Sequence, residues 1–388
     1  MRYRYGVLAA AAGVVALFLG VQLGALLLVE PLQESRGPAV EDPQDPTNSV
    51  VFFGVIVVAT AVMLAAFKYD ADRLIKGLIV AVSVMLSWFV FVELLPPVVT
   101  VEGVDVLALT AALLVGAGLL AYPEWYVIDG AGVLMGAGAA ALFGISFGLL
   151  PAILFLLVLA VYDAISVYKT EHMLSLADGA LDLKIPVVFV VPTTLSYSYL
   201  ETADPFEESR GGGTDGGAAA GTATRNESGL ADARSNEPAP NGGQASVDEG
   251  GRDMDQRPTD ERTADERTAD ERTADERGEY EGDDDRPPVA AGRDALFVGL
   301  GDAVIPTILV ASAVTFLDAP PIEVPLIALN LPALGAVVGT TTGLVVLLYM
   351  VLQGRPHAGL PLLNGGAIGG YLVGAVASGI SVATALGL

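Results

Sequence analysis

The sequence predicts an all-α polytopic membrane protein with nine transmembrane helices. Two observations predict this fold class: 53% of the 388 residues are hydrophobic, with a mean hydropathy of +0.56, and the apolar residues fall in long blocks. A helix needs about 20 mostly apolar residues to cross the hydrocarbon core of a bilayer. Nine blocks of roughly this length cover residues 5–29, 50–67, 74–95, 104–122, 126–149, 151–168, 294–316, 326–352 and 361–387.

The blocks define four parts of the chain. Residues 1–150 hold the first five helices, and residues 151–200 hold the sixth helix and the segment after it. Residues 201–292 form a long polar loop, and residues 293–388 hold the last three helices. The first block has about 25 apolar residues, which is too long for the apolar region of a signal peptide. We therefore expect it to be retained as a helix.

Basic residues mark alternate ends of the blocks and orient the chain. They flank the cytoplasmic ends of membrane helices. Here they are Arg2 and Arg4 before the first block, Lys68, Arg73 and Lys76 after the second, Lys169 and Lys184 after the sixth, and Arg355 after the eighth. The intervening loops hold mainly acids. This pattern predicts a cell-membrane protein whose N-terminus and sixth-to-seventh loop are cytoplasmic and whose C-terminus is extracytoplasmic.

The loop at residues 201–292 carries 25 acidic residues and 10 Arg, and it contains three copies of Thr-Ala-Asp-Glu-Arg. Such a segment buries too little apolar area to offset the entropy of ordering, so we expect it to be disordered. The net charge of −25 with only 4 Lys suits a halophilic archaeon. It argues against nucleic acid as a partner, which would require a basic patch.

A short β-branched segment lies at the start of this loop. Residues 186–192 read Pro-Val-Val-Phe-Val-Val-Pro, which is far too short to span a bilayer. We expect a short strand or an interfacial segment there.

Two acids stand out inside the apolar blocks, Asp163 and Asp302. A carboxylate in hydrocarbon costs at least a few kcal/mol, so an intramembrane acid is a candidate functional residue. Asp163 precedes Lys169 by six residues and Asp302 follows Arg293 by nine. At the helical rise of 1.5 Å these separations are roughly 9 Å and 13 Å, so both acids should lie at similar depth below the cytoplasmic face.

This pair is suited to aspartic proteolysis, which needs no metal and no cofactor. Two carboxyls held within a few ångströms share one proton. The charged member activates a water molecule, and the protonated member polarises a peptide carbonyl. Gly299 and Gly301 leave room beside Asp302 for a neighbouring helix or a substrate backbone. Pro306 removes one helical hydrogen bond nearby.

The motifs around the two acids resemble those of the presenilins and signal peptide peptidases. Tyr162-Asp163 falls in the sixth helix, and Gly299-Leu300-Gly301-Asp302 falls in the seventh. The nine-helix count and the long loop between these helices also match that family, whose archaeal presenilin-like branch is the most similar. The resemblance implies a presenilin-like fold and an intramembrane aspartyl protease of the GxGD type, with Asp163 and Asp302 as its catalytic pair.

The family also has a Pro-Ala-Leu motif at the start of its ninth helix. A literal Pro332-Ala333-Leu334 occurs here, but it opens the eighth block. Pro361-Leu362-Leu363 keeps the position, the Pro and the final Leu. We therefore expect Pro361, Leu362 and Leu363 to serve as the helix-nine motif.

The resemblance implies substrates that are single transmembrane helices and that unwind near the cut, within membrane lipid. Residues 186–192 are then a candidate edge for addition of an unwound substrate strand. The sequence leaves several roles open. Tyr162 is as suited to packing as to bonding the aspartates, and Asn364 to an interhelical hydrogen bond or to the site. Small residues at 132, 136, 140, 144 and 148 indicate close helix packing.

Three other functions compete with this one. A prepilin peptidase shares a Gly-x-Gly-Asp element but has fewer helices. A proton- or cation-coupled transporter would use the Asp pair, but such proteins often contain internal repeats, and none is evident here. A structural scaffold leaves the cost of two buried acids unexplained.

Overall fold

The computed structural model describes residues 2–69, 72–169, 187–194, 197–198, 295–353 and 358–388. The described residues belong to one compact unit, Met1–Ala223 with Arg286–Leu388. The predicted disordered loop at residues 201–292 lies outside the described residues.

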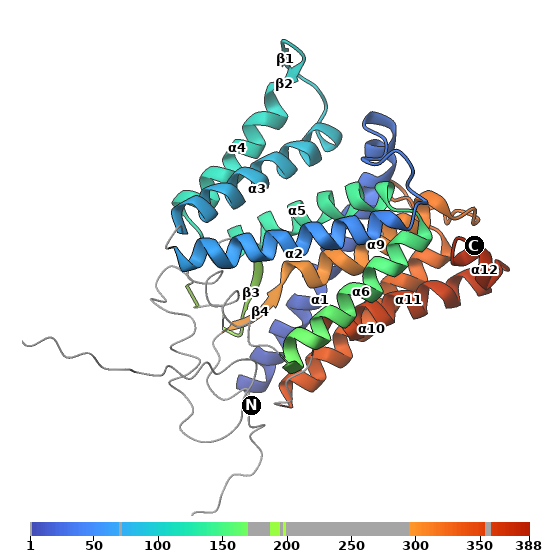
Figure 1. The fold of residues 1–388 in the computed structure, drawn as a ribbon. Coiled ribbons are helices and arrows are strands. Elements are labelled where there is room, and N and C mark those ends of the chain that lie inside the picture. The colour runs from blue at the N-terminus through green and yellow to red at the C-terminus, as the bar shows by residue number, and fades with distance from the viewer. Residues whose placement is uncertain (1, 70–71, 170–186, 195–196, 199–294, 354–357) are drawn as a thin grey trace, which may run out of the picture. The chain divides into compact units, whose positions relative to one another are not determined.

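Each of the nine apolar blocks contains one long helix (Figure 1). Seven of these helices are long and apolar enough to cross a membrane, and two apolar helices of 16 and 17 residues, α4 and α9, accompany them. The helices are α1 (Arg2–Ser35), α2 (Thr47–Lys68), α3 (Asp72–Leu94), α4 (Val106–Ala121), α5 (Trp125–Ser146), α6 (Leu149–Lys169), α9 (Leu300–Phe316), α10 (Leu331–Leu352) and α11 (Gly359–Ala377). A single turn, α12 (Val382–Ala385), follows. The prediction of a polytopic helical membrane protein is confirmed.

The seventh block differs from its prediction at its start. Ala295–Gly299 forms a strand, β4, and the helix α9 begins only at Leu300, with Gly299 as its N-cap. A short apolar run cannot be assigned to strand or helix from its periodicity, and this run continues without a break into the helix. The pairing partner of β4 decides the matter, and it lies more than a hundred residues away in sequence.

That partner is β3 (Val188–Pro192), so the strand expected at residues 186–192 is present. The two strands are antiparallel, with Val188 opposite Gly299 and Val190 opposite Phe297. The last residue of β3 is Pro192, which has no N–H to donate. Pairing of β3 with β4 thus places the chain segment before the long loop beside the start of α9. A second small sheet, β1 (Thr100–Val101) with β2 (Val104–Asp105), precedes α4.

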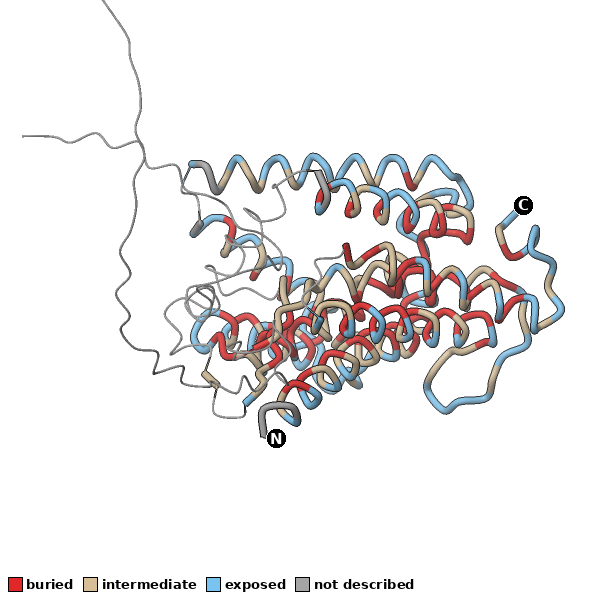
Figure 2. Tube along the Cα trace, turned by 90° about the horizontal axis from the view of Figure 1, so that it is seen from below, coloured by how far each residue is buried: buried red, intermediate tan, exposed pale blue. Residues whose placement is uncertain are grey.

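Helix α5 lies at the centre of the fold and is the most buried of the seven long spans. It packs against α1, α3, α9 and β3. Helices α10 and α11 form a close pair that contacts α9, and α11 also contacts α6. Helix α2 packs against α6 and is largely exposed. Figure 2 shows buried residues gathered where the helices face one another and exposed residues on the outer faces.

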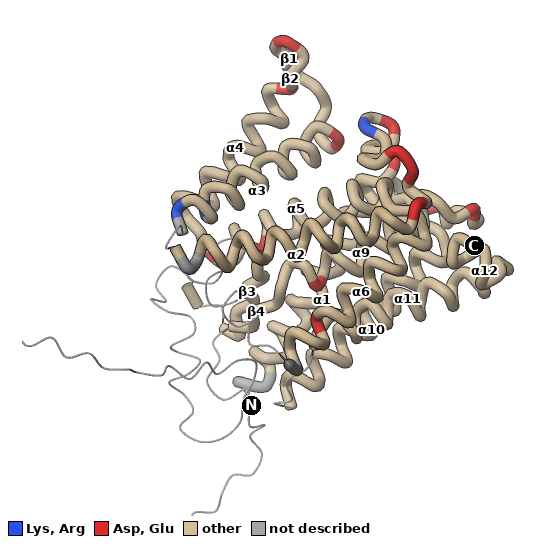
Figure 3. Tube along the Cα trace, in the orientation of Figure 1, with Lys and Arg blue, Asp and Glu red and all other residues tan. Residues whose placement is uncertain are grey.

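Acidic residues collect at one end of the helices. Figure 3 shows them in the connection between α1 and α2, at the β1–β2 tip and at the end of α3. Lys and Arg lie at the opposite end of α3, where that helix begins, and Arg36 lies among the acids in the connection between α1 and α2. The N-terminus and the C-terminus also lie at opposite ends (Figure 1).

Candidate active site

The two predicted aspartates lie on neighbouring helices, and their charges are close enough to interact. Asp163 is on α6 and is 4% exposed, and Asp302 is in the first turn of α9 and is half-buried. Helices α6 and α9 pack against each other. The carboxyl of Asp302 lies within Coulombic range of the carboxyl of Asp163. The fold therefore brings together the two acids that the sequence singled out.

The first turn of α11 lies between the two carboxyls. The N–H of Leu360 donates a hydrogen bond to Oδ2 of Asp163 at 3.0 Å, and the N–H of Gly359 also donates to this side chain. Gly359 faces Asp302 as well, because a Cβ added at Gly359 would lie 3.6 Å from Oδ2 of Asp302. One pair of backbone residues thus contacts Asp163 and adjoins Asp302.

The residues before Asp302 connect its helix to the sheet. Gly299 ends β4 and caps α9, and a Cβ there would lie 3.4 Å from Oδ2 of Asp302. The N–H of Leu300 donates to the carbonyl of Val187, directly before β3, at 2.8 Å. Gly301 is exposed at the helix start. Leu300 therefore anchors the first turn of α9, and the two glycines keep the space beside Asp302 open.

Pro306 lies inside α9, four residues after Asp302. Because Pro has no N–H, the carbonyl of Asp302 loses its usual helical partner. The helix nevertheless continues to Phe316. The first turn of α9 thus has one backbone hydrogen bond fewer than a regular helix.

Asp302 lies beside Asp163, but not because nine residues of helix follow Arg293. Residues 295–299 form the strand β4 instead. A strand rises about 3.3 Å per residue, more than twice the helical value. The approach of the two acids is set by where α9 begins and by its packing on α6, and not by a helical count from Arg293.

Pro361, Leu362 and Leu363 lie in the first two turns of α11, directly after the residues that contact the aspartates. Leu363 is fully buried in a cluster with Leu344 and Leu347 of α10, and the Leu362 backbone passes close to Gly343. The three residues fix the start of α11 by packing. The contacts with Asp163 and Asp302 come instead from Gly359 and Leu360, which the sequence analysis missed. Their signal was their place directly before Pro361.

The literal Pro332-Ala333-Leu334 lies elsewhere. It opens α10, where Asn330 caps the helix by accepting from the N–H of Ala333 at 2.9 Å. On α10, Leu347 lies beside the site: a Cβ at Gly359 would lie 3.4 Å from its Cδ2. Fifteen residues separate Pro332 from Leu347, which is about 22 Å along a helix. The literal motif is therefore remote from the aspartates.

Tyr162 packs against α2. Its ring meets the ring of Phe53 edge-on, with centroids 5.7 Å apart. The aromatic ring of the Tyr-Asp motif thus forms part of the contact between α2 and α6 next to Asp163.

The small residues of α5 pack against β3 and α9, the elements that lead to Asp302. A Cβ at Gly132 would lie 2.8 Å from the ring of Phe189 in β3. A Cβ at Gly136 would lie 3.1 Å from Leu300, two residues before Asp302. Gly144 faces Ala311 on α9. The prediction of close packing along this stripe is confirmed: Gly132, Gly136 and Gly144 meet β3 and α9, and Gly148 meets Pro43 and Gln44.

A further acid of α5 also contacts β3. Asp129 is 5% exposed, and its Oδ1 accepts a hydrogen bond from the N–H of Val190 at 2.8 Å. The sequence analysis passed over this residue because it lies near the start of its helix. Its apolar neighbours, Val127 and Ile128, were the available signal.

The register of the β3–β4 pair decides which backbone groups are free. The bond from Leu300 to Val187 makes this a hydrogen-bonded pair, and such pairs alternate along an antiparallel ladder. Val190 and Phe297, opposite each other, therefore point their N–H and C=O groups away from the sheet. Val190 is bonded by Asp129, whereas the N–H of Phe297 has no partner among the described residues.

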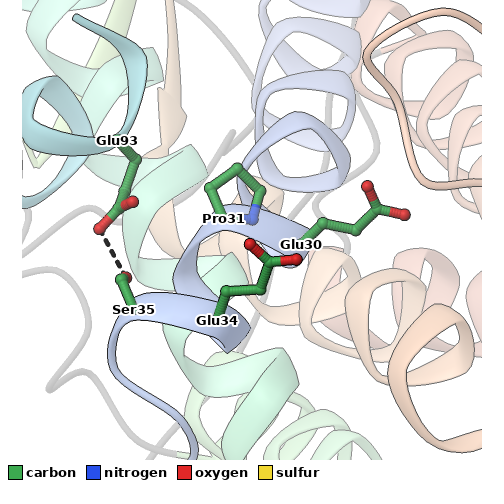
Figure 4. Close-up of a pocket in the computed structure, with 5 residues that line it drawn as sticks. All are labelled: Glu30, Pro31, Glu34, Ser35 and Glu93. Atoms are coloured by element: carbon green, nitrogen blue, oxygen red, sulfur yellow. Dashed lines mark hydrogen bonds between the residues drawn. The ribbon is translucent and has the colours of Figure 1, made fainter. Parts of the chain in front are cut away.

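A hollow of about 460 Å³ lies away from this site, between the ends of α1 and α3 (Figure 4). Its lining residues are Glu30, Pro31, Glu34, Ser35 and Glu93. The Ser35 hydroxyl donates to Oε1 of Glu93 at 2.7 Å and ties the two helices together. None of the lining residues belongs to α6, α9 or α11. Within the described part of the chain, no three His, Asp or Glu side chains are placed to hold a metal ion.

The chain matches the family model described as signal-peptide peptidase, presenilin aspartyl protease, over residues 15–216 and 262–380. It is similar to a solved structure of a presenilin family intramembrane aspartate protease in space group C222, with 28% identity and a TM-score of 0.54. That match covers 95% of this chain and 99% of the other. A structure of a presenilin family intramembrane aspartate protease in space group P2 matches with 29% identity and a TM-score of 0.53, covering 94% and 97%. No curated protein matches the chain. These matches give no support to a transporter.

Proposed function

Because the chain belongs to the signal-peptide peptidase and presenilin family of intramembrane aspartyl proteases, we propose that Asp163 and Asp302 are its catalytic pair. The observation that carries the proposal is the shared neighbour of the two acids. Leu360 donates to Asp163, and Gly359, the residue before it, lies against Asp302. The start of α11 thus adjoins acids of two different helices, α6 and α9.

The chemistry follows from two carboxyls that share one proton. The ionised carboxyl takes a proton from a water molecule as the water oxygen attacks the peptide carbonyl carbon. The protonated carboxyl donates its hydrogen bond to the carbonyl oxygen, where negative charge develops. Transfer of a proton to the amide nitrogen then releases the amine, and the pair again holds one proton. The hydrogen bond from Leu360 fixes the direction in which the Asp163 carboxyl points.

The substrates of this family cross the membrane as helices, and a helix hides its peptide carbonyls in its own hydrogen bonds. We infer that the cleaved segment unwinds and adds as a strand to β4. The sequence analysis placed this edge on residues 186–192, but in the fold the outward N–H of Val190 is occupied by Asp129. The edge with an available donor is that of β4, at Phe297, and β4 leads directly into the helix that carries Asp302.

We further propose the membrane orientation that the charge pattern predicts. The N-terminus and the loop between α6 and α9 are cytoplasmic, and the C-terminus is extracytoplasmic. The acids at the β1–β2 tip and between α1 and α2 then face the exterior (Figure 3). The cut lies nearer the cytoplasmic face, because Asp302 is in the first turn after the cytoplasmic loop.

The test is cleavage of a labelled single-span substrate by the purified full-length protein in lipid. Asp163→Asn and Asp302→Asn keep the shape of the side chain but cannot share the catalytic proton. Each should lower kcat by at least about a hundredfold, the low end of what positioned acid–base groups contribute. Matching thermal unfolding would show that both variants are folded. Wild-type cleavage rates in either folded variant would disprove the assignment.

A further inference from the structure

Asp129 is a buried acid inside a membrane-spanning helix, and the proposed proteolytic mechanism does not use it. It lies in the second turn of α5, and only 5% of its surface is exposed. Its Oδ1 accepts the hydrogen bond from the N–H of Val190 at 2.8 Å, across 61 residues of sequence. A carboxylate inside a membrane is costly and is retained where it serves function.

The bond closes one edge of the two-stranded sheet. In the register of the pair, Val190 points its N–H away from β4 and toward α5. Phe189 of the same strand packs on Gly132, three residues after Asp129. Leu300, at the start of α9, packs on Gly136, four residues further along. Residues three and four apart share one face of a helix. One face of α5 therefore receives β3 and α9 together.

A continuous chain of contacts leads from this face to Asp302. Asp129 bonds Val190, and β3 pairs with β4 along its whole length. The carbonyl of Val187 accepts from the N–H of Leu300, two residues before Asp302. Because Pro306 leaves the first turn of α9 one hydrogen bond short, this turn depends on contacts from outside the helix.

We propose that Asp129 is a positioning residue: it holds β3 against α5 and thereby fixes the first turn of α9, with the carboxyl of Asp302, relative to Asp163. The proposal rests on the proposed function of the Asp163–Asp302 pair. What the site requires of residue 129 is a hydrogen-bond acceptor aimed at Val190, and not an acid. Asparagine has such an acceptor in its amide oxygen, whereas leucine fills the same space without one.

The experiment compares Asp129→Asn, Asp129→Leu and a matched control, Asp105→Leu, in the full-length protein. Asp105 is also a buried acid, 8% exposed, and it accepts from the N–H of Leu107 at 2.9 Å. It caps α4, a helix that packs on α3 and α5. The readouts are kcat and KM on the labelled substrate, thermal unfolding, and hydrogen exchange of the peptide covering residues 187–194.

We expect Asp129→Asn to keep kcat within about threefold of the wild type, and Asp129→Leu to lower it by about tenfold or more with a smaller change in KM, because a misplaced acid weakens the transition state more than substrate binding. Exchange at residues 187–194 should rise in Asp129→Leu alone. Asp105→Leu should lose thermal stability and keep its kcat.

Several results would overturn the proposal. They are a folded Asp129→Leu protein with wild-type kcat, unchanged exchange in β3, or an Asp129→Asn protein as inactive as Asp129→Leu. If Asp129→Leu does not fold, Gly132→Ala displaces the Phe189 ring and loosens the same strand, and wild-type kcat and exchange in that variant would also overturn it. The exchange result needs no activity, so it separates failure of this proposal from failure of the Asp163–Asp302 assignment.

Discussion

The backbone N–H groups of Gly359 and Leu360 hold the Asp163 carboxyl. The side chain of Asn364, one turn further along α11, holds this backbone in place. Asn364 follows Leu360 by four residues on α11 and is fully buried. Its Nδ2 donates to the carbonyl of Leu156 on α6 at 2.8 Å. This is the interhelical alternative that the sequence left open for Asn364. The amide fastens α11 to the helix that carries Asp163.

The residue-scale prediction is that Asn364→Leu lowers kcat about threefold to tenfold, because the Gly359–Leu360 backbone shifts relative to Asp163. The loss of stability should be small, below about 1 kcal/mol, since interhelical hydrogen bonds in membranes contribute little and the Oδ1 of Asn364 has no partner among the described residues.

Tyr371→Phe is the control for this substitution. Tyr371 is fully buried on the same helix, and its hydroxyl donates to the carbonyl of Ala385 at 2.6 Å, near the C-terminus. It should lose similar stability with wild-type kcat. An equal fall in kcat in both variants would show that any loosening of α11 slows the enzyme and that Asn364 has no special role.

At the scale of elements, the two edges of the β3–β4 sheet differ in their partners within the described part of the chain. Asp129 and the imino acid Pro192 leave β3 few donors, while β4 presents the N–H of Phe297. An exposed strand edge is a template for another strand. This difference supports the proposed addition of a substrate strand to β4.

The prediction for this element concerns a series of substrates. Each carries a single proline, placed at a different position of the segment that unwinds. Only every second residue of an added strand points its N–H at β4, so cleavage should fall at alternate positions. Each lost hydrogen bond of about 1 kcal/mol should lower kcat/KM roughly fivefold. A loss that does not alternate along the segment would argue against strand addition, whatever the overall rate.

At the scale of the whole molecule, close backbone approach adds to the apolar clusters in holding the described helices together. Lipid is as apolar as a helix surface, so membrane helices associate where small residues allow close contact. Helices α10 and α11 show this directly. Gly339 faces Gly366, and Gly335 faces Gly370, at distances that leave no room for a Cβ. Leu347 of this pair contacts Gly359, so its packing also supports the site.

At this scale we predict that Gly366→Val lowers the thermal unfolding temperature markedly and abolishes most activity, because its Cβ would overlap the carbonyl of Gly339. Overpacking of this kind typically costs about 1–3 kcal/mol or more. Gly365→Val is the matched control, since the neighbouring position opens onto free space. Equal stability of the two variants, measured in one lipid, would contradict the packing seen between α10 and α11.

The sequence by itself determined the membrane class, the long helix that the described residues show in each apolar block, and the two acids that the fold brings together. These features rest on local physics: the length of an apolar run sets a span, and the cost of a charge in hydrocarbon singles out Asp163 and Asp302. The short strand at β3 was also predictable, because its β-branched run is too short to span.

The tertiary structure alone decided how the site is assembled. Three features depend on partners distant in sequence. The strand β4 replaces the first turns of the seventh helix, Gly359 and Leu360 contact the two aspartates, and Asp129 accepts a hydrogen bond from β3. An apolar residue has no preferred partner, and a backbone N–H is the same at every position. Local sequence therefore cannot specify such contacts, and packing of the helices does.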